Sequence, residues 1–172
     1  MGAEFLTGGN LGGYDFNSIQ LAMTDAIGSP SGFTAMIYGG INNGTGVSPG
    51  SSLATLTGSA NPSTAGIYTY TPTADLVLLP STAYFIVLTA GTFVTDGAYE
   101  WSFAGLPERN AGWGAGNSIL RSANGLNWGF AHTGSAQYAI TATPIPEPGI
   151  LSLLGLSGVA FVWHRKREKR FR

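Results

Sequence analysis

The stretch Ser18-Ile19-Gln20-Leu21-Ala22-Met23 carries a large apolar side chain at every second position, with small or polar residues between them. Successive side chains of a β-strand point to opposite faces, so this alternation predicts a strand with one buried face. The same period recurs from residue 5 to residue 142, without a competing helical period of 3.6. The other predicted strands lie at residues 33–38, 67–70, 84–89, 99–103 and 138–142, with weaker signals at 53–56, 76–79, 119–121 and 128–130.

Turn-forming residues separate these strands. Asp96-Gly97 supplies the positive φ angle that tight hairpin turns require, and we expect a hairpin there between residues 93 and 99. About eight to ten short strands at this spacing predict an all-β fold, specifically an antiparallel β-sandwich that is jelly-roll-like. Residues 106–116 lack periodicity and are expected to form a surface loop, in which Trp113 either plugs an end of the sandwich or is exposed.

Charge is sparse and unevenly distributed. Only 10% of the 172 residues are charged, against roughly a quarter in an average soluble protein. Residues 1–145 contain two cations, Arg109 and Arg121, and seven carboxylates, which gives a net charge of −5. A face that binds nucleic acid needs clustered cations, so we exclude nucleic acid as a partner. The chain has no cysteine, which excludes disulfides and thiolate metal sites.

The last 29 residues, 144–172, differ from the body in every respect. They begin with Pro-Ile-Pro-Glu-Pro at residues 144–148, continue with an apolar run over 149–163, and end in a basic segment over 164–172. Proline stops a preceding element, an uncharged run favours hydrocarbon, and a cationic end stays on the cytoplasmic side of a bilayer. We therefore predict a single C-terminal transmembrane helix at 149–163, with a cytoplasmic C-terminus and the body across the membrane.

The apolar run is short for a transmembrane helix. Its 15 residues span about 22 Å at roughly 1.5 Å per residue, against a hydrocarbon thickness of about 30 Å. Ile145 and the aliphatic stem of Arg165 would extend it. The alternative, a helix packed in a soluble core, requires a polar face that Ser152 and Ser157 do not provide. The predicted basic anchor consists of Arg165, Lys166, Arg167, Lys169 and Arg170.

These blocks divide the chain into four parts. Residues 1–142 form the predicted β-sandwich body, 143–148 a proline-rich linker, 149–163 the transmembrane helix, and 164–172 the basic tail. Residues 1–6 lack both the basic and the apolar region of a secretory signal peptide. We therefore expect a signal peptide upstream of Met1.

Pro146-Glu147-Pro148, with the short Leu/Gly-rich segment and the basic end that follow it, resembles the PEP-CTERM sorting signal of Gram-negative bacteria. The resemblance covers residues 144–172 and implies that Pro146, Glu147 and Pro148 are recognised by an exosortase, a membrane-embedded cysteine transpeptidase that cuts near them. It also implies a precursor in the inner membrane, held by lipid contacts of its helix, and a body that reaches the cell surface or extracellular matrix. Such proteins commonly occur in species that make exopolysaccharide and biofilm.

The body resembles the choice-of-anchor R domain over about residues 5–103. The resemblance rests on Phe5-Leu6-Thr7-Gly8, Ile19-Gln20-Leu21, Phe33-Thr34-Ala35-Met36-Ile37-Tyr38, Pro49-Gly50-Ser51-Ser52-Leu53 and Leu79-Pro80-Ser81-Thr82-Ala83-Tyr84-Phe85. It implies an exported β-rich body that is joined in different members to different C-terminal anchors. In that group, sequence like residues 5–8 usually follows an upstream strand and a signal peptide.

The sequence offers no convincing catalytic, metal or cofactor site. His132 is the one histidine of the body, and no Gly-x-Ser-x-Gly motif accompanies it, so a catalytic triad is not indicated. Asp96 and Glu100 are close in sequence, and paired carboxylates hydrolyse glycosides, but Asp96 is explained by its turn. Calcium ligation by Asp75, Asp96 or Glu100 lacks the usual Asp-x-Asp-x-Asp spacing. We expect no enzymatic activity.

Aromatic residues leave one binding hypothesis open. Tyr99, Trp101 and Phe103 share one face of a predicted strand, where they need no function if they are buried. If exposed, they would stack on sugar rings, with Trp113 and Trp128 as further contacts. The leading hypothesis is a non-enzymatic, exported surface protein. The alternatives are a carbohydrate-binding module for exopolysaccharide, using Trp101, Trp113 and Trp128, and a glycan-active hydrolase.

Overall fold

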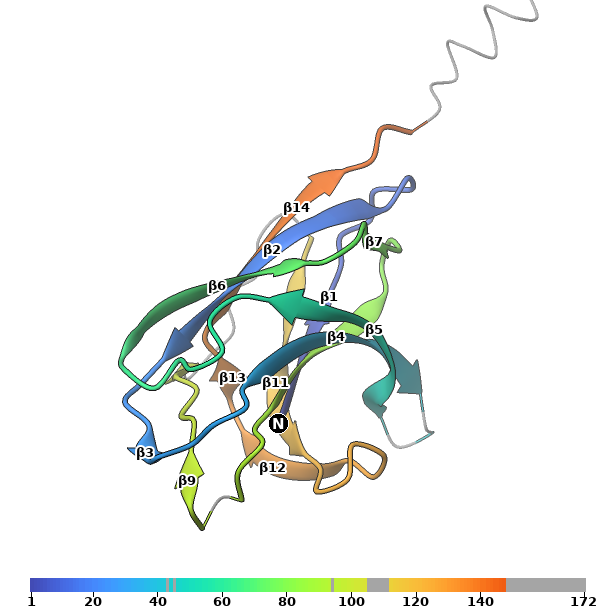
Figure 1. The fold of residues 1–172 in the computed structure, drawn as a ribbon. Helices are drawn as coiled ribbons and strands as arrows, with labels where there is room; N and C mark the ends of the chain where they lie inside the picture. Colours follow the sequence, from blue (N-terminus) through green and yellow to red (C-terminus); the bar gives the residue numbers. More distant parts are fainter. Residues whose placement is uncertain (43, 45, 94, 105–111, 148–172) are drawn as a thin grey trace, which may run out of the picture.

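The computed structural model describes residues 1–42, 44, 46–93, 95–104 and 112–147, and every regular element within these ranges is a β-strand (Figure 1). The all-β prediction is confirmed. In chain order the strands are β1 (Gly2–Leu6), β2 (Tyr14–Met23), β3 (Ile27–Gly28), β4 (Thr34–Asn42), β5 (Val47–Thr57), β6 (Gly66–Pro72), β7 (Val77–Leu78), β8 (Ala83–Thr89), β9 (Gly97–Ala98), β10 (Phe103–Ala104), β11 (Gly114–Arg121), β12 (Gly129–Thr133), β13 (Ser135–Ala136) and β14 (Tyr138–Pro144).

Ten of these strands form one antiparallel sheet in the order β12-β11-β1-β8-β4-β5-β6-β2-β14, with β7 beside the start of β2. The path turns at β5, which pairs with β4 from Val47 to Thr55 but with β6 only at Leu56 and Thr57. One half of the sheet therefore folds over the other. The expected jelly-roll-like sandwich differs from this arrangement because the two layers are hydrogen-bonded into one path at β5.

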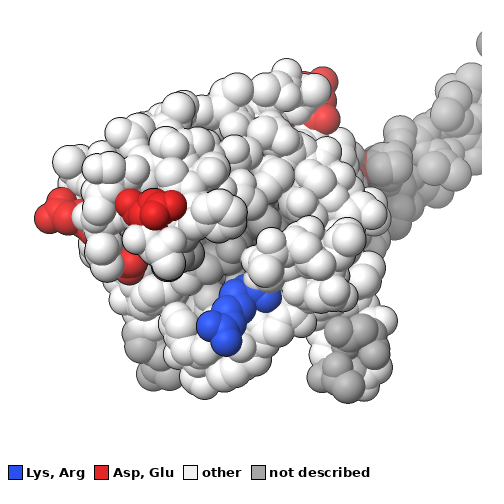
Figure 2. All heavy atoms as spheres, turned by 60° about the horizontal axis from the view of Figure 1, so that its bottom comes forward, with Lys and Arg blue, Asp and Glu red and all other residues white. Residues whose placement is uncertain are grey.

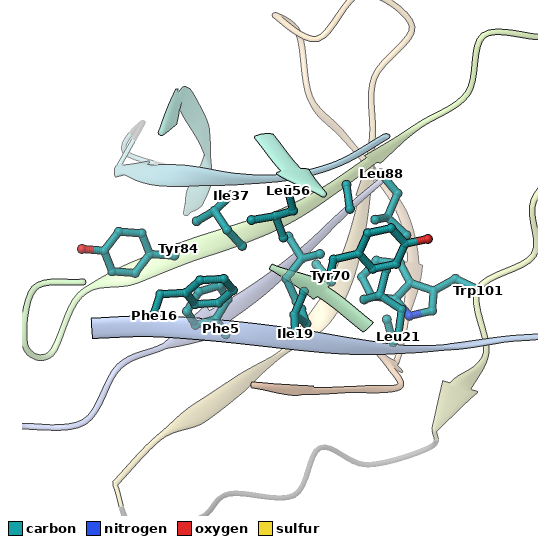
Figure 3. Close-up of a cluster of buried hydrophobic side chains, with 14 of the residues drawn as sticks. Phe5, Phe16, Ile19, Leu21, Ile37, Leu56, Tyr70, Tyr84, Leu88 and Trp101 are labelled. Atoms are coloured by element: carbon teal, nitrogen blue, oxygen red, sulfur yellow. The ribbon is translucent and has the colours of Figure 1, made fainter. Parts of the chain in front are cut away.

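The core lies between the two halves of the sheet. Figure 3 shows Ile19 and Leu21 of β2 pointing toward Ile37 of β4 and Leu56 of β5, and all four side chains are buried. The alternation that predicted β2 is thus the alternation of its buried and exposed faces. Burying one such aliphatic side chain stabilises the fold by about 1.5–3 kcal/mol.

Strand β1, which the sequence pattern did not predict, lies inside the sheet between β8 and β11. Its buried residues Ala3 and Phe5 do alternate with Glu4 and Leu6, but the segment has only five residues. Its register with β11 shifts between Ala3 and Phe5. At that irregularity the carbonyl oxygen of Glu4 accepts a hydrogen bond from the Tyr138 hydroxyl of β14, at 2.9 Å.

The expected hairpin at Asp96-Gly97 is wrong in its pairing. The turn forms, because the backbone N–H groups of Asp96 and Gly97 both donate to the carbonyl oxygen of Phe93. However, the residues that follow, β9, pair with β3 at Ile27 and Gly28 and not with the strand before the turn. The predicted strand at residues 99–103 is reduced to an isolated bridge at Trp101 and the short β10.

The loop expected at residues 106–116 is shorter than the sequence suggested. Residues 105–111 lie outside the described ranges, and β11 already begins at Gly114. Trp113, immediately before β11, packs against Phe5 and Tyr14 at ring distances of 6.2 and 4.9 Å. Of the two expectations for Trp113, packing at one end of the body is the one observed.

Candidate functional site: the sorting segment and an aromatic hollow

The last strand leads directly into the predicted sorting motif. Strand β14 pairs with β2 from Tyr138 opposite Leu21 to Pro144 opposite Tyr14. Because β14 is an edge strand, Pro144 can end it without leaving a neighbouring strand unpaired. The chain therefore leaves the sheet where β2 begins, at the upper end of the body in Figure 1. We call this the tail end.

The residues after β14 are bound to the loop between β1 and β2. The backbone N–H of Ile145 donates to the carbonyl oxygen of Gly13 at 3.0 Å. The side-chain Nδ2 of Asn10 donates to the carbonyl oxygen of Ile145 at 2.9 Å. The backbone N–H of Leu11 donates to Glu147 Oε1 at 3.0 Å. Both the backbone and the acidic side chain of the motif thus have partners on the body.

The loop holds its shape through contacts of its own. Asn10 Nδ2 also donates to the carbonyl oxygen of Gly13 at 2.7 Å, and the N–H of Gly13 donates to the carbonyl oxygen of Asn10 at 2.9 Å. Gly13 has a φ of +79°, a conformation that glycine adopts without strain. At Gly12 a Cβ atom would collide with the carbonyl oxygen of Ile145. The two glycines therefore permit the turn and the close approach of the tail, respectively.

A second feature lies at the opposite end of the body, which we call the far end. Here a hollow of about 730 Å³ opens between the turn before β9 and the connection from β11 to β12. Its lining includes the aromatic residues Phe33, Tyr38, Phe93, Tyr99, Trp101 and Trp128, and the polar residues Thr89, Thr92, Ser122 and Asn124. Figure 2 turns this end toward the viewer and shows a cationic side chain and several acidic ones on an otherwise uncharged surface.

The three tryptophans expected to contact sugars are not brought together. Trp101 is only 2% exposed and its indole N–H donates to the carbonyl oxygen of Gln137 at 2.9 Å, so it is a core residue that borders the hollow. Trp113 lies at the tail end. Trp128 is half-buried and its N–H donates to Gly125 at 3.2 Å. The expected exposed surface of three tryptophans is therefore corrected, because Trp101 is buried and Trp113 packs against Phe5 and Tyr14 at the tail end.

The residues considered as catalytic candidates, Asp96, Glu100 and His132, are all among the described residues. Asp96 is exposed in its turn, and the carbonyl oxygen of Glu100 accepts the N–H of Thr24. The His132 ring packs edge-on against Phe103 at 4.5 Å. Over residues 1–42, 44, 46–93, 95–104 and 112–147, no group of three or more His, Cys, Asp or Glu could hold a metal ion.

Two partly buried ionisable side chains, Glu4 and Tyr138, lie where β14 meets β1, and the Tyr138 hydroxyl donates to the backbone carbonyl oxygen of Glu4. Burial raises the pKa of the Tyr138 phenol, and the neighbouring Glu4 carboxylate raises it further. Burial also raises the pKa of Glu4 from its ordinary value of 4.5. The Tyr138 hydroxyl therefore stays protonated and donates its hydrogen bond to β1 at neutral pH. This bond anchors the strand from which the tail emerges.

An all-β body whose last strand runs into a proline-rich segment, an apolar run and a basic end has the organisation of an exported protein with a C-terminal sorting signal. A protein-family model described as the PEP-CTERM protein-sorting motif matches residues 144–167. The motif implies processing by exosortase, a membrane-anchored precursor and a final location at the cell surface. No curated protein and no solved structure matches the chain.

Part of the predicted sorting signal lies outside the described residues. Among the residues that are described, no helix is long and apolar enough to cross a membrane. The predicted transmembrane segment 149–163 is not among them. Neither are Pro148 and the predicted basic anchor, Arg165, Lys166, Arg167, Lys169 and Arg170.

The loop that holds the motif was not identified from the sequence. Asn10-Leu11-Gly12-Gly13 has the composition of a turn, and that composition indicates only a local bend. The partner of Asn10, Ile145, is 135 residues away in the chain. Proximity in space over such a separation follows from the pairing of β2 with β14, which no local pattern reveals.

Proposed function

We propose that this protein is a non-enzymatic surface component of a Gram-negative bacterium, delivered by its C-terminal signal. Residues 149–163 span the inner membrane and residues 164–172 remain in the cytoplasm until exosortase cuts near Pro146-Glu147-Pro148. The match to the sorting motif over residues 144–167 carries this proposal. The likeness of the body to the choice-of-anchor R domain agrees with it, since that group joins β-rich bodies to exchangeable anchors.

The test is fractionation of a tagged full-length protein in its host. We expect a shortened form outside the inner membrane in the wild type, and an uncleaved membrane-bound form after deletion of the exosortase or with Glu147→Ala. Asp75→Ala is the matched control, because it removes an exposed carboxylate far along the chain from the motif. Unchanged processing after exosortase deletion would refute the proposal.

The hollow at the far end supports a second candidate function, binding of a neutral glycan such as exopolysaccharide. Its volume of about 730 Å³ lies in the range of roughly 300–1,000 Å³ of small-ligand sites. Aromatic rings bind sugar faces, while hydroxyl and amide groups such as those of Thr92 and Asn124 hydrogen-bond sugar hydroxyls. This function would use Trp128, Tyr99 and Phe93 in place of the three tryptophans named from the sequence.

Affinity electrophoresis in gels containing the host exopolysaccharide tests this candidate. Phe93→Ala removes an exposed ring of the hollow and should reduce retardation at least severalfold. Phe130→Ala removes an exposed ring outside the lining and should leave it unchanged. Equal retardation of all three proteins would exclude the hollow as a glycan site. Release of reducing ends that is lost in Glu100→Gln would instead support the hydrolase alternative.

A further inference from the structure

The contacts at residues 145–147 are unexpected for a signal that another protein must recognise. Recognition of an extended peptide uses its backbone groups and the side chains between them. In this structure the N–H and the carbonyl oxygen of Ile145 are both hydrogen-bonded to the body, and so is the carboxylate of Glu147. These three groups of the segment are thus already hydrogen-bonded within the same chain.

We propose that residues 10–14, which we call the clasp, are a binding site for the peptide segment 145–147, and that exosortase competes with the clasp for this segment. The ligand class is an extended, proline-containing peptide with a carboxylate. The proposal rests on the proposed function, because it concerns access to the sorting motif. It adds that the folded body controls how fast exosortase processes that motif.

The clasp has the construction of a binding site. Asn10 bridges two carbonyl oxygens, that of Gly13 in the loop and that of Ile145 in the tail. The N–H of Asn10 donates in turn to the Tyr14 hydroxyl at 3.1 Å, which fixes the residue at the start of the turn. A side chain at Gly12 would occupy the place of the Ile145 carbonyl. The bonds to Gly13 and Tyr14 fix the loop, and the bond from Asn10 to Ile145 and the close approach at Gly12 position the tail on it.

The ligand segment is prepared for docking. Pro144 and Pro146 flank Ile145, and each proline fixes its own φ near −65°. The residue before a proline is also confined to extended conformations. Ile145 and the residues around it therefore lose little conformational entropy when the segment binds in an extended form.

The contacts differ in how much they contribute. The bond from Leu11 to Glu147 is exposed to solvent, whereas the bonds of Asn10 are partly buried and gain more from the lower local dielectric. Asn10 and Gly12 therefore decide whether the clasp is closed. Neither residue is part of the motif that exosortase recognises, so each can be changed without altering the substrate peptide.

Competition has a simple kinetic consequence. When only the open state is recognised, the apparent affinity for the enzyme falls in proportion to the open fraction. Loss of the hydrogen bond from Asn10 to the tail should therefore raise the rate of processing by about three- to tenfold. The collision in Gly12→Ala should raise it at least as much, since it displaces the Ile145 carbonyl directly.

The experiment compares full-length precursors with Asn10→Ala, Gly12→Ala and Asn17→Ala. Asn17 is the matched control: its Nδ2 donates to Thr143 Oγ1 at 2.8 Å, so its removal deletes one contact between β2 and β14 without touching residues 145–147. Pulse-chase labelling in cells with exosortase gives the rate of processing. Deuterium exchange of the purified precursors reports protection of the Leu11 and Ile145 amides. Thermal unfolding confirms that each variant is folded.

The proposal predicts faster exchange at both amides and faster processing for Asn10→Ala and Gly12→Ala, with Asn17→Ala like the wild type. Faster exchange without faster processing would overturn the competition with exosortase. Unprotected amides in the wild type would overturn the binding site itself. Failure of the proposed function is distinguishable, because the wild type would then be processed equally with and without exosortase, and amide exchange would still test the clasp.

Discussion

The two ends of the body are built from opposite ends of the same strands but use different chemistry. At the tail end, glycines and one amide side chain bring two backbones within hydrogen-bonding distance, as in the contacts of Asn10 and Gly13 with Ile145. At the far end, aromatic side chains line a hollow whose lining contains no Lys, Arg, Asp or Glu side chain. The tail end thus binds residues 145–147 of its own chain, whereas the far end carries the hollow for which we propose glycan binding.

Strand β8 connects the two ends. Near its start the Tyr84 hydroxyl accepts the N–H of Leu79 at 2.8 Å and its ring stacks on Phe5, close to the tail end. Near its end Val87 and Leu88 line the hollow. All five residues from Tyr84 to Leu88 are buried. The two ends therefore differ in their surface residues but share the buried strand β8.

The largest expected effect tests whether the ends are independent. Ile86, fully buried at the middle of β8, lies opposite Ala3 of β1 and Ile37 of β4. Ile86→Ala should lower the free energy of unfolding by about 2–5 kcal/mol, through lost burial and a residual cavity. Ile27→Ala, which truncates an exposed isoleucine, should change it by less than about 0.5 kcal/mol.

Urea denaturation gives these free energies, and amide exchange shows where protection is lost. If the core is shared, Ile86→Ala should accelerate exchange at Leu11 in the clasp and at residues 122–125 beside the hollow by similar factors. Loss of protection at one end only would show two separately folding ends. The tail end and the far end would then be two structural units and not two surfaces of one.

Tyr138→Phe tests the anchoring of the tail end and is expected to have an intermediate effect. It removes the hydroxyl that donates to the carbonyl oxygen of Glu4 and leaves that acceptor without this donor. The expected loss is about 1–2 kcal/mol in the free energy of unfolding, measured by urea denaturation. Exchange should increase along β14 more than beside the hollow. An unchanged stability would show that another donor replaces the hydroxyl.

Glu4 provides a pH-dependent version of the same test. Because burial raises its pKa in the folded state, the folded protein binds a proton more tightly than the unfolded chain. Stability should therefore fall as pH rises from the unfolded value of 4.5 through the raised folded pKa, and the penalty persists at neutral pH. Well below pH 4.5 the carboxyl is protonated in both states and contributes nothing.

Glu4→Gln should remove this penalty. Since the side chain is half-buried, the gain at pH 7 is at most about 1 kcal/mol. The difference between variant and wild type should shrink as the pH is lowered through 4.5 in the same denaturation assay. A destabilised variant at pH 7 would mean that the ionised carboxylate makes a favourable contact, contrary to the direction of its pKa.

The sequence predicted the features that depend on neighbouring residues and missed those that depend on residues far apart in the chain. The alternation at residues 18–23 predicted both β2 and its buried face, because burial of one face of a strand is visible in its own residues. The turn at Asp96-Gly97 was also local and is present. The predicted partner of the strand after this turn was wrong. That strand, β9, pairs with β3, whose residues are about 70 positions away in the chain.

The candidate sites follow the same division. Trp101 was assigned to a possible sugar contact from its place on a strand face, but which face is covered depends on Gln137 and Tyr138 of a distant segment. The sorting motif was identified because its residues are consecutive, and the match at 144–167 bears this out. The clasp that binds it escaped detection since Asn10 and Ile145 are joined only by the completed sheet.

The smallest expected effect concerns stability at the far end. Phe93 is 82% exposed and follows the buried part of β8, so Phe93→Ala should change the free energy of unfolding by less than about 0.5 kcal/mol. An exposed aromatic ring at the rim of a hollow contributes little to folding, and the energy of covering it is gained only when a ligand binds.

Thermal unfolding with and without exopolysaccharide separates the contribution of Phe93 to folding from its contribution to ligand binding. The wild type should unfold at a higher temperature with the polymer, Phe93→Ala should show little shift, and both should coincide without it. A loss of stability in the absence of polymer would instead make Phe93 a structural residue, and the far end would then resemble the tail end in serving the chain's own fold.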